Sequence, residues 1–300
     1  MTRQHLGLLV LLSVLWGGSF LFIGIAVEQI APLHLVFLRV AIAAVVMIVV
    51  LRIMGVRLPT NLEGWRPFLV MGALNNVIPF TLIFYAQTEI SVSLAAIVNS
   101  TTPVFTFLIL AAAGAERLIA TKLIGSLVGI CGVVILVDPT HLIFDSATKG
   151  IMLSTAAAIS YGFSGLWAKR HLSSTPPLQS TGCQLMSSTL ILGVLLPFVG
   201  PPIPSQMPDL SALASVLALA IFSTAWAYII FFRLITEAGA SNAMLVTLLV
   251  PISASLLGWL VMNDSLSTHQ ILGALTIAAA LVVIDGRAWR LLRDSIDPRL

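Results

Sequence analysis

Charged residues are scarce in this sequence. Aspartate, glutamate, lysine and arginine make up 9% of its 300 residues, whereas soluble domains carry about 25%. Hydrophobic residues make up 58% of the chain, so a soluble globular class is excluded and we predict an all-α integral membrane protein. The small net charge of +3 then bears on membrane topology and not on nucleic-acid binding.

Cysteine and histidine are also sparse. Both cysteines, Cys131 and Cys183, lie in apolar runs, which excludes a disulfide framework and favours a packing role. The five histidines fall at predicted helix ends or in loops, and the sequence has no metal-ligand cluster, glycine-rich phosphate loop or pair of buried carboxylates. We therefore expect no metal and no cofactor.

Long apolar runs dominate what is present. A helix needs about 20 apolar residues to cross the ~30 Å hydrocarbon core of a bilayer. The runs that approach this length lie at 6–27, 33–51, 67–87, 92–113, 121–138, 149–168, 178–199, 211–232, 241–262 and 269–286. The first run follows Arg3 and His5 as a secretory signal would, but no small-residue cleavage site appears before Glu28. We predict ten transmembrane helices.

Basic residues predict the orientation of these helices. With a cytoplasmic N-terminus, 13 basic residues fall in cytoplasmic segments and only Lys149 lies on the opposite side. The 13 are Arg3, Arg52, Arg57, Arg66, Arg117, Lys122, Lys169, Arg170, Arg233, Arg287, Arg290, Arg293 and Arg299. By the positive-inside rule, both termini are cytoplasmic.

The segment 84–136 returns without a gap 148 residues later, as 232–284. Matched pairs include Thr88 with Thr236, Glu89 with Glu237, Ser93 with Ser241, Pro103 with Pro251, Glu116 with Asp264 and Gly125 with Gly273. Prolines, glycines and acids that agree at one fixed offset indicate an internal duplication. We predict a first five-helix repeat at 1–138, an extracytoplasmic linker at 139–148, a second repeat at 149–286 and a basic cytoplasmic tail at 287–300.

Five helices per copy is an odd number, so the second copy enters the membrane inverted. The loop 114–122 carries Arg117 and Lys122, where its copy 262–270 has Ser265 and Gln270. Positive charge thus follows the side of the membrane and not the repeat position. Inverted repeats place substrate sites near the bilayer midplane between the halves, and transport by alternating access.

Several short motifs carry a family resemblance. In the first half they are Leu15–Phe20 (LWGGSF), Phe37–Arg39 (FLR), Pro103, Gly114–Leu118 (GAERL) and Gly125, and in the second half Pro251, Asn263–Leu266 (NDSL) and Gly273. The chain resembles the ten-helix, EamA-type members of the drug/metabolite transporter superfamily over 5–138 and 149–286. The resemblance implies a multi-pass protein of the bacterial inner membrane that exports amino acids or other small metabolites. The YddG-type amino-acid exporters are one branch it resembles, although no motif separates them from their relatives.

Candidate cavity residues come from six of the predicted helices. Helix 1 places Trp16, Ser19 and Phe20 on one face at helical spacing, and helix 6 offers Tyr161 and Ser164 at corresponding positions. They predict pocket walls, with interhelix packing as the alternative. The further candidates are Asn75, Asn76, Phe80, Asn99, Thr102, Thr224, Trp226, Tyr228 and Thr247.

Three prolines fall inside predicted helices, and each has a polar residue four positions earlier. They are Pro79, Pro103 and Pro251. Proline removes the hydrogen bond to the carbonyl at i−4, and non-helical backbone at membrane depth is tolerated only beside protein or an aqueous cavity. We expect these prolines to interrupt their helices as hinges that face the pathway. A kink that serves packing alone is the alternative.

Arg39 is the one strong charge deep inside a predicted span. Because an intramembrane charge costs at least ~2.5–3.5 kcal/mol, it should face protein or water and have a partner. One hypothesis is a counter-charge for a substrate carboxylate. The favoured alternative is a structural role, in which Arg39 reaches carbonyl groups or extends toward Glu28 or Asp138.

A glycine face marks helix 5. Gly125 and Gly129 form a GxxxG motif that Gly132 extends. We expect this face to pack within a monomer, on helix 10 with Gly273, and a dimer interface is the alternative.

An intramembrane serine protease is the rival class of function. Gly162–Gly165 (GFSG) matches the G-x-S-G of rhomboid proteases, whose serine needs a histidine base within hydrogen-bond reach. His34, His141 and His269 are predicted at the far side of the membrane from Ser164. We therefore expect a transporter and not an enzyme.

The substrate follows from the expected lining. Aromatic rings mixed with Asn, Thr and Ser suit uncharged or zwitterionic small molecules, so amino acids are the first choice and lipophilic drugs the alternative. The twelve acids lie in loops or near helix ends, which leaves the pathway without an evident proton carrier. We expect facilitated or exchange transport.

Overall fold

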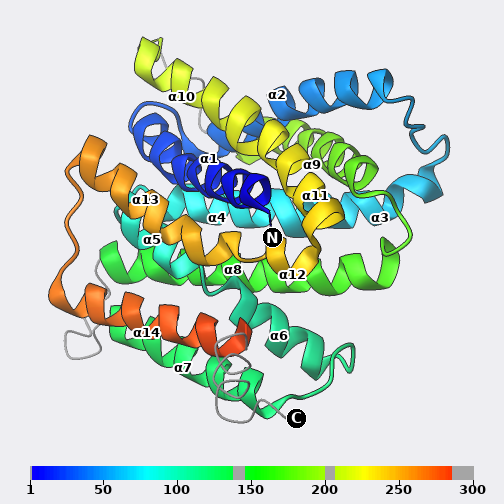
Figure 1. Cartoon of the computed structure of the whole chain (residues 1–300). Coiled ribbons are helices and arrows are strands. Elements are labelled where there is room, and N and C mark those ends of the chain that lie inside the picture. Colours follow the sequence, from blue (N-terminus) through cyan, green and yellow to red (C-terminus); the bar gives the residue numbers. More distant parts are fainter. Residues whose placement is uncertain (1, 138–145, 200–206, 286–300) are drawn as a thin grey trace.

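A computed structural model of the chain describes residues 2–137, 146–199 and 207–285, and these segments are helical with no strand among them. Figure 1 shows their arrangement. The elements are α1 (Arg3–Val27), α2 (Pro32–Ile53), α3 (Leu62–Gly72), η1 (Ala73–Val77), α4 (Ile78–Ala86), α5 (Val92–Asn99), α6 (Thr102–Ala112), α7 (Ala120–Val137), α8 (Ser146–His171), α9 (Pro177–Val199), α10 (Leu210–Ala220), η3 (Ile221–Trp226), α11 (Ala227–Ala238), α12 (Ala240–Ala243), α13 (Val246–Met262) and α14 (Thr268–Asp285).

Helix starts carry the expected capping residues. The side chains of Thr2, Asn61, Ser91 and Asp209 each accept a hydrogen bond from the backbone N–H three residues later. Such bonds satisfy N–H groups that the first turn of a helix leaves without a partner. Asp209 also accepts from Ser211 and Gln29, and these bonds together lower its pKa to about 2.

Seven helical segments are long and apolar enough to cross a membrane. They are Arg3–Val27, Pro32–Ile53, Leu62–Ala86, Val92–Ala112, Ser146–His171, Pro177–Val199 and Leu210–Ala238. Shorter apolar helices lie at Ala120–Leu136, Val246–Met262 and Thr268–Ile284. Helices thus occupy each of the ten ranges expected from the sequence. That all ten cross the membrane stays a prediction.

Two of these segments contain a wide turn that the sequence did not predict. The π-helical η1 joins α3 to α4, and the π-helical η3 joins α10 to α11. Their first residues, Ala73 and Ile221, are 148 positions apart, which is the repeat offset. A π turn inserts an extra residue into the helix and changes the direction of the side chains that follow.

The helices pack in a pattern that is the same when the two halves are exchanged. In the first half α1 packs on α13 and on the span formed by α10, η3 and α11, and in the second half α8 packs on α6 and on the span formed by α3, η1 and α4. The second helices α2 and α9 pack on each other, and each also contacts the π segment of the opposite half. The two halves are therefore interlocked. Their origin by duplication, and the inversion of the second copy across a membrane, stay predictions.

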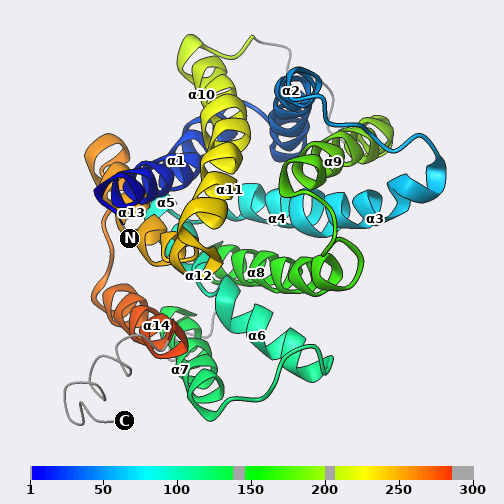
Figure 2. The same cartoon turned by 45° about the vertical axis from the view of Figure 1, so that its right-hand side comes forward.

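The last helices of the two halves, α7 and α14, form a pair at one side of the molecule (Figures 1 and 2). A Cβ added at Gly132 would lie 2.7 Å from Ile277 Cγ1 and 3.2 Å from the Gly273 carbonyl oxygen. Gly125 faces Ala280 and Ile284 in the same way. The predicted packing of the glycine face on the last helix is confirmed.

The prolines behave differently from one another, which corrects the expectation that each interrupts a helix. Pro79 follows η1, and Pro103 opens α6 after a gap at Ser100 and Thr101. Pro251 lies inside the continuous α13. The break in that segment falls earlier, at Met244 and Leu245, because α12 is a separate short turn of helix.

Candidate functional site

A cavity of about 680 Å³ lies between the two halves. Eleven of the fourteen predicted cavity residues line it, namely Trp16, Ser19, Phe20, Asn75, Phe80, Asn99, Thr102, Tyr161, Ser164, Tyr228 and Thr247. Arg39 and Pro103 line it as well. The lining comes from helices of both halves, so the cavity needs the two together.

Three predicted cavity residues lie elsewhere. Asn76 and Thr224 are fully buried behind the wall, where Asn76 Nδ2 donates to Ser188 Oγ at 2.9 Å. Trp226 is 49% exposed on the outside of the bundle beside Phe222. All three lie within a π turn, where side-chain directions depart from α-helical spacing. Asn75 and Asn76 are also neighbours in sequence, so they cannot face the same way.

Asn75 is the centre of a polar network on the cavity wall. Its Nδ2 donates to Gln184 Oε1 at 3.2 Å, and its Oδ1 lies 3.0 Å from the Ser164 hydroxyl. Tyr228 also interacts with this amide. The network joins η1 to α8, α9 and α11, so one amide from the first half is held by three elements of the second.

Aromatic rings continue the cavity wall from Tyr228. The Trp16 ring lies edge-on to Tyr228 at 6.4 Å between centroids, and 5.1 Å from Phe231. Tyr228 stacks on Phe232 at 6.1 Å. Such ring pairs contribute about 0.5–1.5 kcal/mol beyond the area they bury, and they give the cavity a rigid apolar side.

Arg39 is held at the cavity by two contacts from opposite halves. Its Nε donates to Thr224 Oγ1 at 3.0 Å, and its guanidinium carbon lies 3.8 Å above the Phe80 ring centroid. Within the described residues it forms no ion pair with Glu28, and Asp138 lies outside them. Arg39 therefore faces the cavity between the halves.

Residues of α9 were missed from the sequence. Thr181 and Gln184 line the cavity, yet their counterparts in helix 2, Leu33 and Val36, are apolar. The amide of Gln184, 4% exposed in the middle of an apolar helix, was the available signal, because a polar group at that depth requires a partner.

The cavity reaches the surface at one end. Its lining continues to the exposed residues Lys169, Ser173 and Pro177, where α8 ends and α9 begins. Near the middle of the molecule it is bounded by the buried Phe20, Ile23 and Ile83.

Asp264 joins the two halves beyond Phe20 and Ile23, where it lines a second pocket of about 310 Å³. The α13 helix ends at Asn263 in the left-handed conformation, and the Asp264 N–H bonds back to Gly258 O at 3.2 Å. Asp264 Oδ2 then accepts from both the N–H and the hydroxyl of Ser93, each at 3.0 Å. A carboxylate from the second half thereby caps the start of α5 in the first.

The repeat counterpart of Asp264 makes a different contact. Glu116 N–H bonds to Leu110 O at 3.2 Å, which repeats the backbone turn of Asp264. Its side chain instead accepts from Lys122 at 2.5 Å, and α6 does not pack on α12 as α13 packs on α5. The two ends of the cavity thus differ in a contact that the duplication would make equal.

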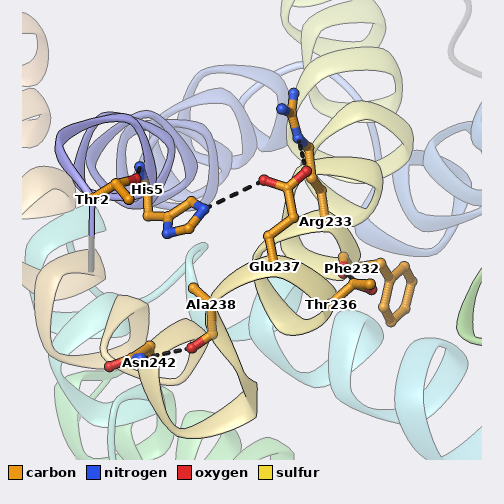
Figure 3. Close-up of polar contacts among 8 residues, drawn as sticks. All are labelled: Thr2, His5, Phe232, Arg233, Thr236, Glu237, Ala238 and Asn242. Carbon is orange, nitrogen blue, oxygen red and sulfur yellow. Dashed lines mark hydrogen bonds and ion pairs between the residues drawn. The ribbon is translucent and has the colours of Figure 1, made fainter.

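A second pair of repeat-related acids ties each half to the other. Glu89 accepts from Lys149 Nζ of α8 at 2.5 Å, and this bond lowers the pKa of Glu89. Glu237, its counterpart, lies 3.4 Å from His5 Nε2 of α1 and accepts from Arg233 Nε at 2.8 Å (Figure 3). In both cases an acid at or just beyond the end of the third span of one half contacts the first helix of the other.

Comparison with known proteins places this geometry in context. The family model described as the EamA-like transporter family matches residues 5–138 and 148–285. The uncharacterized transporter YoaV of Bacillus subtilis is 23% identical, over 94% of this chain and 96% of that protein. A probable amino-acid metabolite efflux pump of Escherichia coli is 27% identical over 97% and 98%, and protein PecM of Dickeya dadantii 26% over 94% and 93%. A solved crystal structure, 19% identical, superposes with a TM-score of 0.64 over 94% of this chain and 98% of that one, which shows the fold alone.

Proposed function

Since the chain belongs to the EamA-like transporter family, we propose that it is a secondary transporter that exports small metabolites, amino acids first among them, across the bacterial inner membrane by alternating access. The family and the names of the relatives indicate a transporter and not an enzyme. The lipid bilayer is its surroundings, and it works as a monomer.

One observation carries this proposal. A cavity of about 680 Å³, lined by both halves, reaches the surface at one end while Asp264 caps α5 at the other. A space of this size is within the ~300–1,000 Å³ range of small-molecule sites. A site open to one side and closed to the other is what one state of an alternating-access transporter requires.

The membrane arrangement belongs to the same proposal. Ten spans form two inverted five-helix repeats, with both termini in the cytoplasm. The exchange-symmetric packing and the repeat-related contacts of Glu89 and Glu237 support it. The exposed mouth carries Lys169 and Arg170, so the positive-inside rule puts it in the cytoplasm, where an exporter loads its substrate.

Amino acids are the first choice of substrate for two reasons. The cavity combines the amides of Asn75 and Gln184 with an aromatic wall, which suits a molecule with polar and apolar parts. One relative is named a probable amino-acid metabolite efflux pump. Lipophilic drugs, the alternative, would use the aromatic wall and leave the amides without ligand partners.

The purified full-length protein in proteoliposomes tests the function. We expect counterflow of at least one radiolabelled amino acid, abolished by Gly165→Phe, which fills the cavity wall beside Thr106. Gly7→Phe adds the same ring where nothing lies within 4 Å and should leave transport unchanged. Transport of aromatic drugs, with no amino acid moved or competing, would favour the alternative.

Energy coupling needs its own experiment. None of the described residues that line the cavity is an acid, so we propose facilitated or exchange transport down the substrate gradient. An imposed pH gradient should then fail to drive substrate uphill. Uphill movement that a protonophore abolishes would show proton coupling instead.

A further inference from the structure

Arg39 is a buried charge whose hydrogen-bonding groups are mostly unused. The side chain is 6% exposed, and within the described part of the chain Thr224 is its hydrogen-bond partner, through Nε. A guanidinium has five N–H donors. The four on the two terminal nitrogens, the Nη groups, are left for a partner from outside these contacts.

Among the described residues, none pairs a negative charge with Arg39. The ion pairs among the described residues involve Glu89, Glu116 and Glu237, each at a helix end and paired with another base or histidine. The neighbours of Arg39 are the ring of Phe80 and, within electrostatic range, the phenols of Tyr161 and Tyr228. A buried guanidinium without an anion is costly unless one arrives.

The contacts of Arg39 also fix its orientation. The Thr224 hydroxyl donates to Leu219 O at 2.8 Å across the π turn, so its oxygen is free to accept from Arg39 Nε. Phe80 covers one face of the guanidinium plane. Held at one edge and on one face beside an open cavity, the group presents the fork that binds a carboxylate through two parallel hydrogen bonds.

We propose that Arg39 binds the carboxylate of the transported solute in the cavity between the halves. This inference rests on the proposed function and narrows it to solutes that carry a carboxylate. Thr224 and Phe80 are positioning residues for the guanidinium. A permanently cationic drug meets like charge at this point, so the site discriminates against it.

The same cavity offers acceptors for an ammonium group. The side-chain oxygens of Asn99, Thr181 and Ser223 line it or lie at its wall, and each is buried without a hydrogen-bond partner among the described residues. Neutral oxygens and one guanidinium in the same cavity suit a zwitterion of net charge zero. A phosphate dianion would need a second cation, and Lys169, at the mouth, already donates to the Ala115 carbonyl.

Transport kinetics in proteoliposomes test the contact between Arg39 and the substrate carboxylate. For an amino acid that wild type moves, Arg39→Gln should raise KM on the order of ten- to a hundred-fold, the range of a charge-assisted hydrogen bond. Inhibition by the matching amino-acid amide, which has no carboxylate and carries a net positive charge, should not weaken. Arg52→Gln removes an exposed arginine from the end of the same helix and is the matched control, with KM unchanged.

Two further variants separate binding from folding. Arg39→Lys keeps the charge and loses the fork, so it should raise KM for the acid without affecting the amide, and it carries the test if Arg39→Gln does not fold. Thr224→Val frees the edge of the guanidinium and should raise KM less than Arg39→Gln. An unchanged KM in folded Arg39→Gln and Arg39→Lys would refute carboxylate binding by Arg39 without contradicting the proposed exporter function.

A binding measurement tests carboxylate binding by Arg39 even if no amino acid is transported, a result that would contradict the proposed substrate but not this inference. Thermal stability of the purified protein is measured with L-phenylalanine, L-phenylalaninamide and phenyl phosphate. We expect stabilisation by the amino acid alone, lost in Arg39→Gln and kept in Arg52→Gln. No difference between acid and amide, or a shift by phenyl phosphate alone, would refute carboxylate binding.

Discussion

Replacing Asp264 by Asn should loosen the closed end of the cavity. The Asp264 carboxylate accepts two hydrogen bonds from Ser93, both at 3.0 Å, and it faces the start of α5, where a helix favours negative charge. Hydrogen bonds to a charged group contribute about 1.5–3 kcal/mol each. Because the asparagine oxygen still accepts one bond and the site is half-buried, we expect a net loss of about 1–2 kcal/mol, or a roughly 5- to 30-fold shift toward opening.

Cysteine accessibility measures that shift. Val92→Cys places a thiol at a position that is 3% exposed, next to Gly24 at the closed end, in a chain whose native cysteines are replaced by alanine. Addition of Asp264→Asn should speed labelling by a membrane-impermeant maleimide by the same factor. Glu116→Gln, which changes the repeat counterpart at the other end, should not speed it. Equal labelling with and without Asp264→Asn would refute the idea that this carboxylate holds the end shut.

Three other predictions concern packing, pH and the pathway. Gly132→Leu should lower the melting temperature, since its side chain would meet Ile277 and the backbone of α14 and overpacking costs about 1–3 kcal/mol; Gly7→Ala, with nothing within 4 Å, should not. Lys149 lowers the pKa of Glu89 below its ordinary 4.5, so their ion pair stabilises the fold above that pH, and this stability is lost as the pH falls through the folded pKa. Melting temperatures measured from pH 7 to pH 3.5 should therefore fall less steeply toward acid pH in Glu89→Gln than in wild type. Pro103→Ala, at the gap between α5 and α6, should slow turnover with little change in KM. An equal reduction of turnover and of substrate affinity would contradict a hinge there.

Composition and spacing predicted the helices well and the π turns not at all. Ala73–Val77 and Ile221–Trp226 each hold two adjacent polar residues, but such residues also occur in α-helices, so composition did not separate a π turn from an α turn. As a result, the predicted directions of three side chains were wrong. Asn76 and Thr224 were assigned to the cavity and lie behind its wall, and Trp226 faces outward.

Arg39 shows which part of a site the sequence reveals. A lone charge in an apolar span predicts that a partner exists, because the cost of burying it is a property of the residue. The identity of the partner is not local information. Thr224 lies 185 residues away, and it meets Arg39 because the second helix of one half packs on the π segment of the other.

The pairing of α7 with α14 has a consequence for biosynthesis. The chain leaves the ribosome from its N-terminus, so the glycine face of α7 enters the membrane while its partner, the final helix, has yet to be made. Small-residue faces in membranes associate with whatever helix approaches closely. Until α14 has been made, the glycine face of α7 is therefore without its partner helix. In a chain that stops before residue 268, this face could pair with α7 of a second truncated copy.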